Sequence, residues 1–503
     1  MMEHDELVCV INLGMTGIRM IVYNHLGNPV HTSYHKLLSS KYTSTRFTQK
    51  PGEWVSKMEG LIINCPLSVS KHIKYFTVTG SASCLICCDA AGNALNEAIM
   101  VSDARAVAQA ARINGLVAND SSLLSSKLET DCSLMLPKIL WIKENAPALY
   151  EKTYKFLAVN DYLICYLTGV FATDCYNALK CGYDIATGEY PTRLLSLLEI
   201  DAEKLPPVAA VGSGVGPVTP EMKSKLMLEN DCLVIQTTYD SICSFYGADS
   251  GKEGDLFDVS GTVTSLRLLS TETEEKPNIY KAPYLLNANY NIYGGSNNLS
   301  GGLVDWLKDV FMSKAENPYL KLEDAACKSE VGARGIVFLP YLMGERFPLW
   351  IPDIRGTFWG LGRASSCEDM IRAAFESYGL SLRLMIDELL KNNIRVDKLF
   401  LSGGLTQIEE ISQIKADVTG LETVVLENYE TTAYGAFVLI KRLFFYEAID
   451  ESRHYDPKRI KAVFSPNPKN HDKYMAAYET YRNIYKALLP TYNQGKEPAS
   501  YAQ

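Results

Sequence analysis

The sequence predicts an α/β protein built from two similar domains. The chain has 503 residues, whereas a single hydrophobic core rarely grows beyond about 250–300 residues. Apolar, β-prone runs divided by a glycine-containing turn occur at residues 7–23 and again at residues 256–269. Such runs are typical of antiparallel hairpins. Their recurrence predicts a duplicated architecture.

Segments with helical periodicity follow these hairpins. Apolar residues recur at i, i+3 and i+4 in residues 138–152, 161–167 and 366–391, which predicts helices that face a core. Near the end of the sequence, tyrosines repeat every three or four residues, which predicts a terminal amphipathic helix. These tyrosines are Tyr474, Tyr478, Tyr481 and Tyr485.

A polar, glycine-containing stretch at residues 248–254 marks the expected connection between the domains. We therefore expect an N-terminal domain at residues 1–248 and a C-terminal domain at residues 249–447. Residues 448–503 are expected to form a helical tail that packs on the C-terminal domain.

Charge and hydropathy narrow the class of protein. Lys and Arg number 49 against 58 Asp and Glu, for a net charge of −9, which argues against a surface that binds the nucleic-acid backbone. The N-terminus is acidic where a secretory signal would be basic. No run of about 18 uncharged apolar residues predicts a membrane span. We expect a cytoplasmic protein with no nucleic-acid or membrane partner.

Cysteine and histidine usage restricts the chemistry. Thirteen cysteines stand mostly in apolar segments, which favours reduced core thiols. The CxxC at residues 84–87 has no second ligand pair, so we interpret it as core packing. No histidine occurs between His72 and His454. Catalysis in that region must therefore use carboxylates, hydroxyls or backbone amides.

A glycine-containing turn connects the two strands of the first hairpin. Gly14-Met15-Thr16-Gly17 can direct backbone N–H groups and the Thr16 hydroxyl at phosphate oxygens, although many ordinary hairpin tips have the same composition. No GxxxxGK[ST] motif is present, which excludes a standard P-loop NTPase. Residues 212–217 resemble a dinucleotide fingerprint but end in proline, so we interpret them as a loop.

Three further segments are candidates for chemistry. Asp240 follows an apolar strand and precedes an apolar segment that we expect to be helical. It is either the N-cap of that helix or a general base at the carboxyl end of the strand. Gly403-Gly404 follows another apolar strand, and the pair either admits a flat ring or makes a tight turn. Residues 345–355 include Glu345, Arg346, Asp353 and Arg355. We interpret these four residues as surface charges that pair with one another.

Taken in order along nearly the whole chain, these motifs resemble the FGGY family of carbohydrate kinases, which share a fold with hexokinase, actin and Hsp70. The matching segments are Asp103-Ala104-Arg105, Lys138-Ile139-Leu140-Trp141, Asp161-Tyr162-Leu163, Leu167-Thr168-Gly169, Thr173-Asp174, the Asp240 segment, Ser260-Gly261-Thr262, Pro340 to Leu361, Gly403-Gly404, Ala416 to Gly420, and Glu430 with Gly435-Ala436.

The resemblance implies two ribonuclease-H-like (actin-like ATPase) domains with an active-site cleft between them. It also implies ATP-dependent phosphorylation of a hydroxyl of a small carbohydrate, with Mg²⁺ as cofactor and Asp240 as catalytic base. No other partner is implied, and a homodimer is left open. The implied substrate-binding residues are Asp103, Ser81, Ala82, Ser83 and Asp240; the implied ATP-binding residues are Gly14, Met15, Thr16, Arg19, Gly261, Thr262, Gly403, Gly404 and Gln407; the implied metal site is Asn12 and Asp240, acting indirectly.

The sequence departs from the family pattern at its first phosphate motif. Asn12 stands where the family usually has Asp, and Met15 replaces a usual Thr. An amide is a weaker Mg²⁺ ligand than a carboxylate, so we expect a kinase with a weakened metal site. The alternative is a weakened or inactive sugar- or nucleotide-binding regulator on the same fold. The order of the motifs disfavours an actin- or chaperone-like structural ATPase.

The substrate expectation stays broad. Residues 79–84 lack the Met and His that xylulokinases have in this place. Residues 294–302 and 345–350 look more like gluconokinase-type members. The resemblance thus leaves a ketopentose, a sugar acid and a polyol as candidate acceptors.

Overall fold

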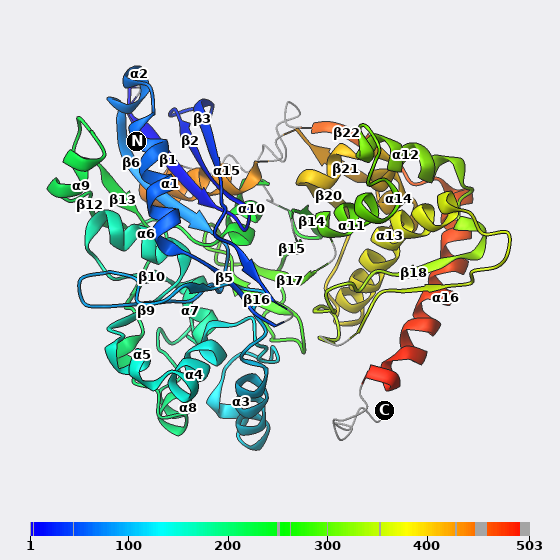
Figure 1. The fold of residues 1–503 in the computed structure, drawn as a ribbon, viewed down its shortest axis with the longest axis horizontal. Coiled ribbons are helices and arrows are strands. Elements are labelled where there is room, and N and C mark those ends of the chain that lie inside the picture. The colour runs from blue at the N-terminus through cyan, green and yellow to red at the C-terminus, as the bar shows by residue number, and fades with distance from the viewer. Residues whose placement is uncertain are drawn as a thin grey trace. The chain divides into compact units, whose positions relative to one another are not determined.

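The computed structural model describes residues 2–3, 5–43, 45–248, 252–261, 263–298, 300–351, 354–427, 430–447 and 460–492. They form two compact units, Met1–Asp249 with Glu430–Glu451, and Ser250–Tyr429 with Ser452–Gln503. Each unit is a mixed α/β fold organised around one large sheet (Figure 1).

The sheet of the first unit has the strand order β12-β13-β6-β1-β2-β3. β1, β2 and β3 form an antiparallel meander, while β6 and β13 run parallel to β1. The strands are β1 (Leu7–Leu13), β2 (Gly17–Tyr23), β3 (Pro29–Lys36), β6 (Ile73–Gly80), β12 (Gly214–Pro217) and β13 (Leu233–Ile235). β1 is buried along almost its whole length, as expected for a strand covered on both faces.

Helices and short strands complete the first unit. They are β4 (Lys41–Tyr42), β5 (Phe47–Gln49), α1 (Pro51–Ile63), α2 (Leu67–Ser70), β7 (Ile86–Cys88), β8 (Ala98–Ile99), α3 (Val107–Asn119), α4 (Met135–Asn145), α5 (Pro147–Lys152), β9 (Lys155–Leu157), α6 (Val159–Thr168), β10 (Thr173–Asp174), α7 (Cys175–Ala178), α8 (Thr192–Leu197), β11 (Val208–Ala209), α9 (Pro220–Lys225), α10 (Asp240–Gly247) and α15 (Thr431–Leu439).

The sheet of the second unit has the order β16-β17-β15-β14-β20-β21-β22. Its elements are β14 (Asp255–Ser260), β15 (Thr264–Ser270), β16 (Tyr280–Pro283), β17 (Asn291–Asn297), α11 (Gly301–Phe311), α12 (Pro318–Lys328), β18 (Val337–Leu339), β19 (Thr357–Trp359), α13 (Cys367–Lys391), β20 (Lys398–Ser402), α14 (Glu409–Thr419), β21 (Thr423–Leu426), β22 (Ile460–Phe464) and α16 (Pro468–Tyr492). Again an antiparallel meander, β14-β15-β17, borders two parallel strands, β20 and β21. The two units therefore repeat one topology, which confirms the predicted duplication.

The predicted helices occur with one correction. α13 begins after Ser366, whose side chain accepts the Asp369 N–H in a capping box, and α16 buries all four predicted tyrosines. The prediction of a single helix at residues 138–152 is wrong, because the helix is interrupted at Ala146 and divided into α4 and α5. Pro147 begins α5, and a residue before proline is disfavoured in the helical conformation.

Two other expectations are corrected. Residues 214–217 form the edge strand β12 rather than a loop, since an edge strand tolerates proline. Glu345 is buried, not a surface charge, and its carboxylate accepts the backbone N–H groups of Leu349 and Ile351. Burial raises the pKa of Glu345 to about 7. Asp353 lies outside the described residues.

The chain passes between the units more often than the expected three-part division implies. Residues 430–447, which we expected in the C-terminal domain, belong to the first unit. There α15 packs on α10 and β1, and Figure 1 shows its orange ribbon beside the blue strands. The described part of the tail supplies the strand β22 as well as α16. Residues 249–251 of the expected connection are outside the described part.

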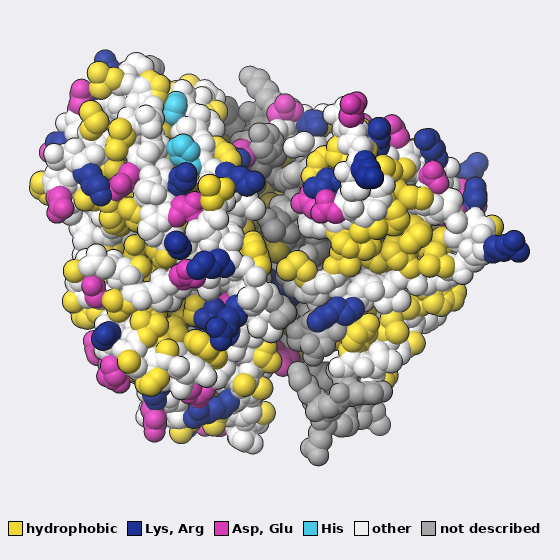
Figure 2. Space-filling model, viewed as in Figure 1, with side chains coloured by type: hydrophobic (Ala, Val, Ile, Leu, Met, Phe, Trp, Pro, Cys, Tyr) yellow, Lys and Arg dark blue, Asp and Glu magenta, His cyan; other side chains and the backbone are white. Residues whose placement is uncertain are grey.

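Surface and cysteine chemistry are in line with the composition. Figure 2 shows basic and acidic side chains interspersed over the visible face of each unit. All thirteen cysteines lie in the described residues and none is in a disulfide; Cys84, Cys87 and Cys88 are buried in the core. Among the described residues, no helix combines the length and apolar character that crossing a bilayer requires.

Candidate active site

Three predicted segments of the first unit meet at one edge of its sheet. β1, β6 and β13 are parallel, so their carboxyl ends reach the same edge, where ligand sites of α/β proteins collect. β1 ends before the Gly14 turn, β6 ends before Ser81, and β13 leads to Asp240. The Ser81 N–H donates to the Leu13 carbonyl at 3.0 Å, which joins the first two segments directly.

Asp240 is the first residue of α10. Tyr239 occupies the N-cap position, so the structure does not use Asp240 as the N-cap. One Asp240 carboxylate oxygen accepts the Ser241 N–H at 2.7 Å, and the residue is half-buried. The positive end of the helix dipole favours an ionised carboxylate there, which is the state that a general base requires.

The position of α10 is fixed by a close crossing with α15. A Cβ at Gly435 of α15 would overlap the Cys243 carbonyl of α10, so the two backbones are in direct contact. The Ser244 and Thr432 hydroxyls also share a hydrogen bond of 2.5 Å. The base candidate therefore sits on a rigid support.

Unpaired acceptors lie beside the ends of β1 and β6. Within the described residues, Asn12 Oδ1 and Ser81 Oγ are buried and have no hydrogen-bond partner. Asn12 pairs in register with Thr79 of β6. Buried polar groups normally have partners, so these atoms are suited to receive a ligand or an ion.

The Gly14–Thr16 turn has a support that the sequence did not reveal. The buried Gln49 donates its amide to the Met15 carbonyl at 2.7 Å, and its own oxygen accepts the Trp54 indole N–H at 2.9 Å. Gly14 N–H donates to the Gly17 carbonyl at 2.9 Å. No local pattern marks Gln49, because its partner is 34 residues away in sequence.

Arg19 and Asp103, two further predicted site residues, are held in ion pairs. The Arg19 guanidinium donates to Glu430. The carboxylate of Asp103 is fully buried and accepts four N–H groups: Arg105 Nε at 2.7 Å, Nη2 at 2.8 Å and backbone N–H at 3.1 Å, and the Phe47 N–H at 2.7 Å. These donors fill the roughly four acceptor sites of a carboxylate. In this structure Asp103 orients Arg105, and its direct substrate contact stays a prediction.

Ser81, Ala82 and Ser83 form a tight turn after β6. Ser83 has a left-handed backbone with φ of 58°, which is costly for a residue with a side chain. The Ser83 carbonyl accepts the ammonium of Lys138 at 2.7 Å. The sequence predicts Lys138 in a helix, but no sequence pattern indicates this contact.

The second unit brings Gly261 and Gly403 together at the carboxyl ends of the parallel strands β14 and β20. Gly403 has φ of 93°, and a Cβ there would overlap the Ser260 carbonyl. The Gly261 carbonyl accepts the Ser300 hydroxyl at 2.7 Å. Gly404 and Gln407 are exposed at the same edge, whereas Thr262 lies outside the described residues.

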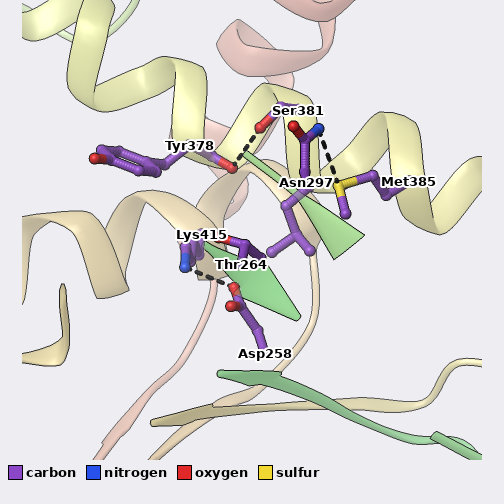
Figure 3. Close-up of a pocket in the computed structure, with 8 residues that line it drawn as sticks. Asp258, Thr264, Asn297, Tyr378, Ser381, Met385 and Lys415 are labelled. Atoms are coloured by element: carbon purple, nitrogen blue, oxygen red, sulfur yellow. Dashed lines mark hydrogen bonds and ion pairs between the residues drawn. The ribbon is translucent and has the colours of Figure 1, made fainter. Parts of the chain in front are cut away.

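A buried ion pair lies beside this turn, at the end of β14. Lys415 of α14 donates to Asp258 Oδ2 at 2.6 Å, and Asp258 Oδ1 accepts the Ser260 hydroxyl at 2.6 Å. Figure 3 shows the pair at a small pocket that Thr264 and Tyr378 also line. No local pattern in the sequence indicates this pair, because its members are 157 residues apart.

The sheet topology and these two edges define a class of protein with duplicated ribonuclease-H-like domains, as in actin-like ATPases. Residues 7–247 match the N-terminal domain of the FGGY family of carbohydrate kinases, and residues 259–443 match its C-terminal domain. The chain belongs to this family and is a carbohydrate kinase. The resemblance inferred from the ordered motifs is thereby confirmed.

Individual relatives and solved structures agree with the family. The chain is 26% identical to a xylulose kinase of Bacillus subtilis over 491 residues, which cover 95% of this chain and 97% of the relative. It is 28% identical to a gluconokinase of Bacillus licheniformis over 318 residues, which cover 60% of this chain and 61% of the relative.

The fold matches solved structures over nearly the whole chain. A ligand-bound xylulose kinase from Lactobacillus acidophilus superposes with a TM-score of 0.88 at 21% identity, covering 97% of this chain and 99% of that one. Plasmodium falciparum glycerol kinase with ADP has a TM-score of 0.80 at 20% identity, covering 95% and 98%.

Proposed function

We propose that the protein transfers the γ-phosphoryl group of ATP to a hydroxyl of a small carbohydrate, with Asp240 as general base. The observation that carries this proposal is the place of Asp240 at the start of α10. The carboxylate stands at the sheet edge that also presents the unpaired oxygens of Asn12 and Ser81. The ADP in the glycerol kinase structure supports a nucleotide as the phosphoryl donor.

In the proposed reaction, an acceptor hydroxyl oxygen forms a bond to the γ-phosphorus, and the bond from that phosphorus to the β-phosphate oxygen breaks to release ADP. The hydroxyl proton passes to the Asp240 carboxylate. Phosphoryl transfer needs little covalent assistance from the protein, so the absence of histidine between His72 and His454 is no obstacle.

Nucleotide contacts are assigned to the glycine turns. Backbone N–H groups around Gly14, Met15 and Thr16 are proposed to receive phosphate oxygens, with Arg19 nearby in its pair with Glu430. In the second unit we assign the phosphates to Gly261 and Thr262, and adenosine to Gly403, Gly404 and Gln407. The turn at Gly403 supports the last assignment, because a residue with positive φ and no Cβ leaves the backbone there open to a flat ring.

Asn12 and Asp240 offer two oxygen donors for Mg²⁺, which prefers hard oxygen ligands and usually retains several waters. The unpartnered Asn12 Oδ1 fits this role. Mg²⁺ would neutralise charge on the phosphates when bound. Within the described residues, no group of three or more His, Cys, Asp or Glu side chains forms a metal site, so the substrate phosphates would complete the coordination.

The acceptor is proposed to be a ketopentose, a sugar acid or a polyol. The xylulose kinase and gluconokinase relatives support the first two classes, and the glycerol kinase structure supports the third. Ser81, Ala82 and Ser83, with Arg105 held by Asp103, are the proposed acceptor contacts.

A screen of ADP release with ATP and Mg²⁺ tests the proposal. We expect turnover that depends on one of D-xylulose, D-gluconate or glycerol, or on a close analogue in those classes. ADP release that no carbohydrate stimulates, with nucleotide binding intact, would instead support the second candidate, a regulator that binds sugar or nucleotide. The presence of Asn12 in place of the usual Asp favours this second candidate, because an uncharged amide is a weaker Mg²⁺ ligand than a carboxylate.

Asn12→Asp separates the two candidates further. In an active kinase with a weakened metal site, the substitution lowers the Mg²⁺ concentration at half-maximal rate. In a regulator it leaves the chain without turnover. Asn24→Asp, at an exposed turn of the same unit, is the control for the added charge.

A further inference from the structure

A buried lysine lies behind the proposed acceptor site and takes no part in the proposed chemistry. Lys138 of α4 is fully buried. Its ammonium donates three hydrogen bonds, to the carbonyls of Ser83 at 2.7 Å, Met100 at 2.9 Å and Ser133 at 2.9 Å. An ammonium has three donors and no acceptor, so the three carbonyls match its full capacity.

Two of these carbonyls belong to the segments that carry the proposed acceptor contacts. The Ser83 carbonyl ends the turn Ser81–Ser83. The Met100 carbonyl also accepts the Asp103 N–H at 3.1 Å, and so it begins the turn that places Asp103. One side chain therefore contacts the backbone of both segments.

The Ser83 turn needs such a contact. Its left-handed backbone, with φ of 58°, is disfavoured for any residue with a Cβ. The hydrogen bond from Lys138 thus holds the turn in a conformation that its own sequence does not favour.

We infer that Lys138 is a positioning residue for the acceptor, which sets the geometry of the turns at Ser83 and Asp103 through their carbonyls. The inference rests on the proposed function, because its main readout is the KM for the acceptor. Lys138 itself contacts backbone and does not need to touch substrate. The protonated form is the competent one, since a neutral amine retains two N–H donors for three carbonyls.

The charged and titratable groups around the ammonium are Cys84, Asp103, Asp131 and Cys132. Burial lowers the pKa of Lys138 to about 8, and these groups act in the opposite direction. Burial keeps Cys84 protonated by raising its pKa to about 12, and Asp103 is held in its pair with Arg105. The lowered pKa places the loss of the Lys138 proton within the range from pH 7 to pH 9.

The first test is Lys138→Met, which keeps an unbranched side chain one atom shorter and removes its donors. We expect the KM for the acceptor to rise roughly tenfold or more, while the KM for ATP stays within about twofold. The matched control is Lys143→Met on the same helix, because Lys143 donates to Leu198 and Glu199 at the surface. A folded Lys138→Met protein with an unchanged acceptor KM would overturn the inference.

The second test needs only the wild-type protein and so does not depend on the folding of the variant. From pH 7 to pH 9, the KM for the acceptor should rise as Lys138 loses its proton, whereas the KM for ATP should not follow it. A flat acceptor KM across this range contradicts the inference. Failure of the proposed function has a different signature, since no acceptor would then be phosphorylated at any pH.

Discussion

The two units repeat one sheet topology, yet each buries a lysine beneath its candidate turn in a different way. In the first unit, Lys138 is surrounded by three backbone carbonyls. In the second unit, Lys415 forms an ion pair with Asp258, which is buried too. Within the described residues, three carbonyls and no carboxylate accept from the ammonium of Lys138, whereas a carboxylate pairs with the ammonium of Lys415.

The turns at Ser83 and Gly403 also differ in how their backbone conformation is stabilised. In the first unit, Ser83 is left-handed although it has a side chain, and a lysine holds its carbonyl. In the second unit, the left-handed residue is Gly403, which has no Cβ to strain the turn. One turn depends on a distant donor and the other on a missing side chain. A donor that titrates can make its turn sensitive to pH, and a glycine cannot.

The largest stability effect is expected from breaking the ion pair of the second unit. Lys415→Met leaves the Asp258 carboxylate buried without its partner, which should lower the free energy of unfolding by about 3–5 kcal/mol. The double variant Lys415→Met with Asp258→Leu removes the unpaired charge and should recover most of this loss. Urea unfolding measures both. A loss below about 1 kcal/mol in the single variant would show that the pair does not compensate charge as described.

Lys138 in the first unit should instead make the free energy of unfolding depend on pH. Burial lowers its pKa from 10.5 to about 8 in the folded protein, so between these pH values the unfolded chain binds more protons. The contribution of Lys138 to stability therefore increases as the pH rises from 8 to 10.5, by about 3 kcal/mol. It is lost again as the pH falls through 8.

Buried cysteines act in the opposite direction, because burial raises the pKa of groups such as Cys87 to about 12. The quantity to measure is therefore the difference in unfolding free energy between wild type and Lys138→Met at pH 7.5 and pH 10. We expect wild type to gain on the variant as the pH rises. If the unfolding free energies of wild type and Lys138→Met changed in parallel with pH, Lys138 would not have the lowered pKa that we attribute to its burial.

A smaller effect should separate the two adjacent glycines of the second unit. Gly403→Ala places a Cβ against the Ser260 carbonyl at a positive φ and should cost about 2 kcal/mol of stability. Gly404→Ala meets nothing within contact distance and serves as the control for stability. Thermal unfolding of both variants gives the comparison, and equal midpoints would mean that the Gly403 turn tolerates a side chain.

The sequence was informative where local pattern determines structure. The two hairpins, the capped helix α13 and the tyrosine stripe of α16 follow from periodicity and capping, and the ordered motifs gave the family. Pro147 could have divided the helix predicted at 138–152, since proline at a first helical position is a recognised start signal.

The supports of the site could not be predicted, because they depend on contacts between distant segments. Gln49 reaches the Met15 carbonyl, and Lys415 reaches Asp258 across 157 residues. Lys138 was visible as a residue of a motif, but its three carbonyl partners are defined only by the folded backbone. Such contacts involve no sequence periodicity at all.

The most direct test of the account is the sugar-dependent ADP release of Asp240→Asn. Removing the general base should lower kcat by roughly 10²–10⁴-fold while binding of the acceptor and of ATP persists in calorimetry. Asp231→Asn is the matched control, because Asp231 is an exposed partner of Lys223 in the same unit. Wild-type turnover in Asp240→Asn would contradict the assignment of the base.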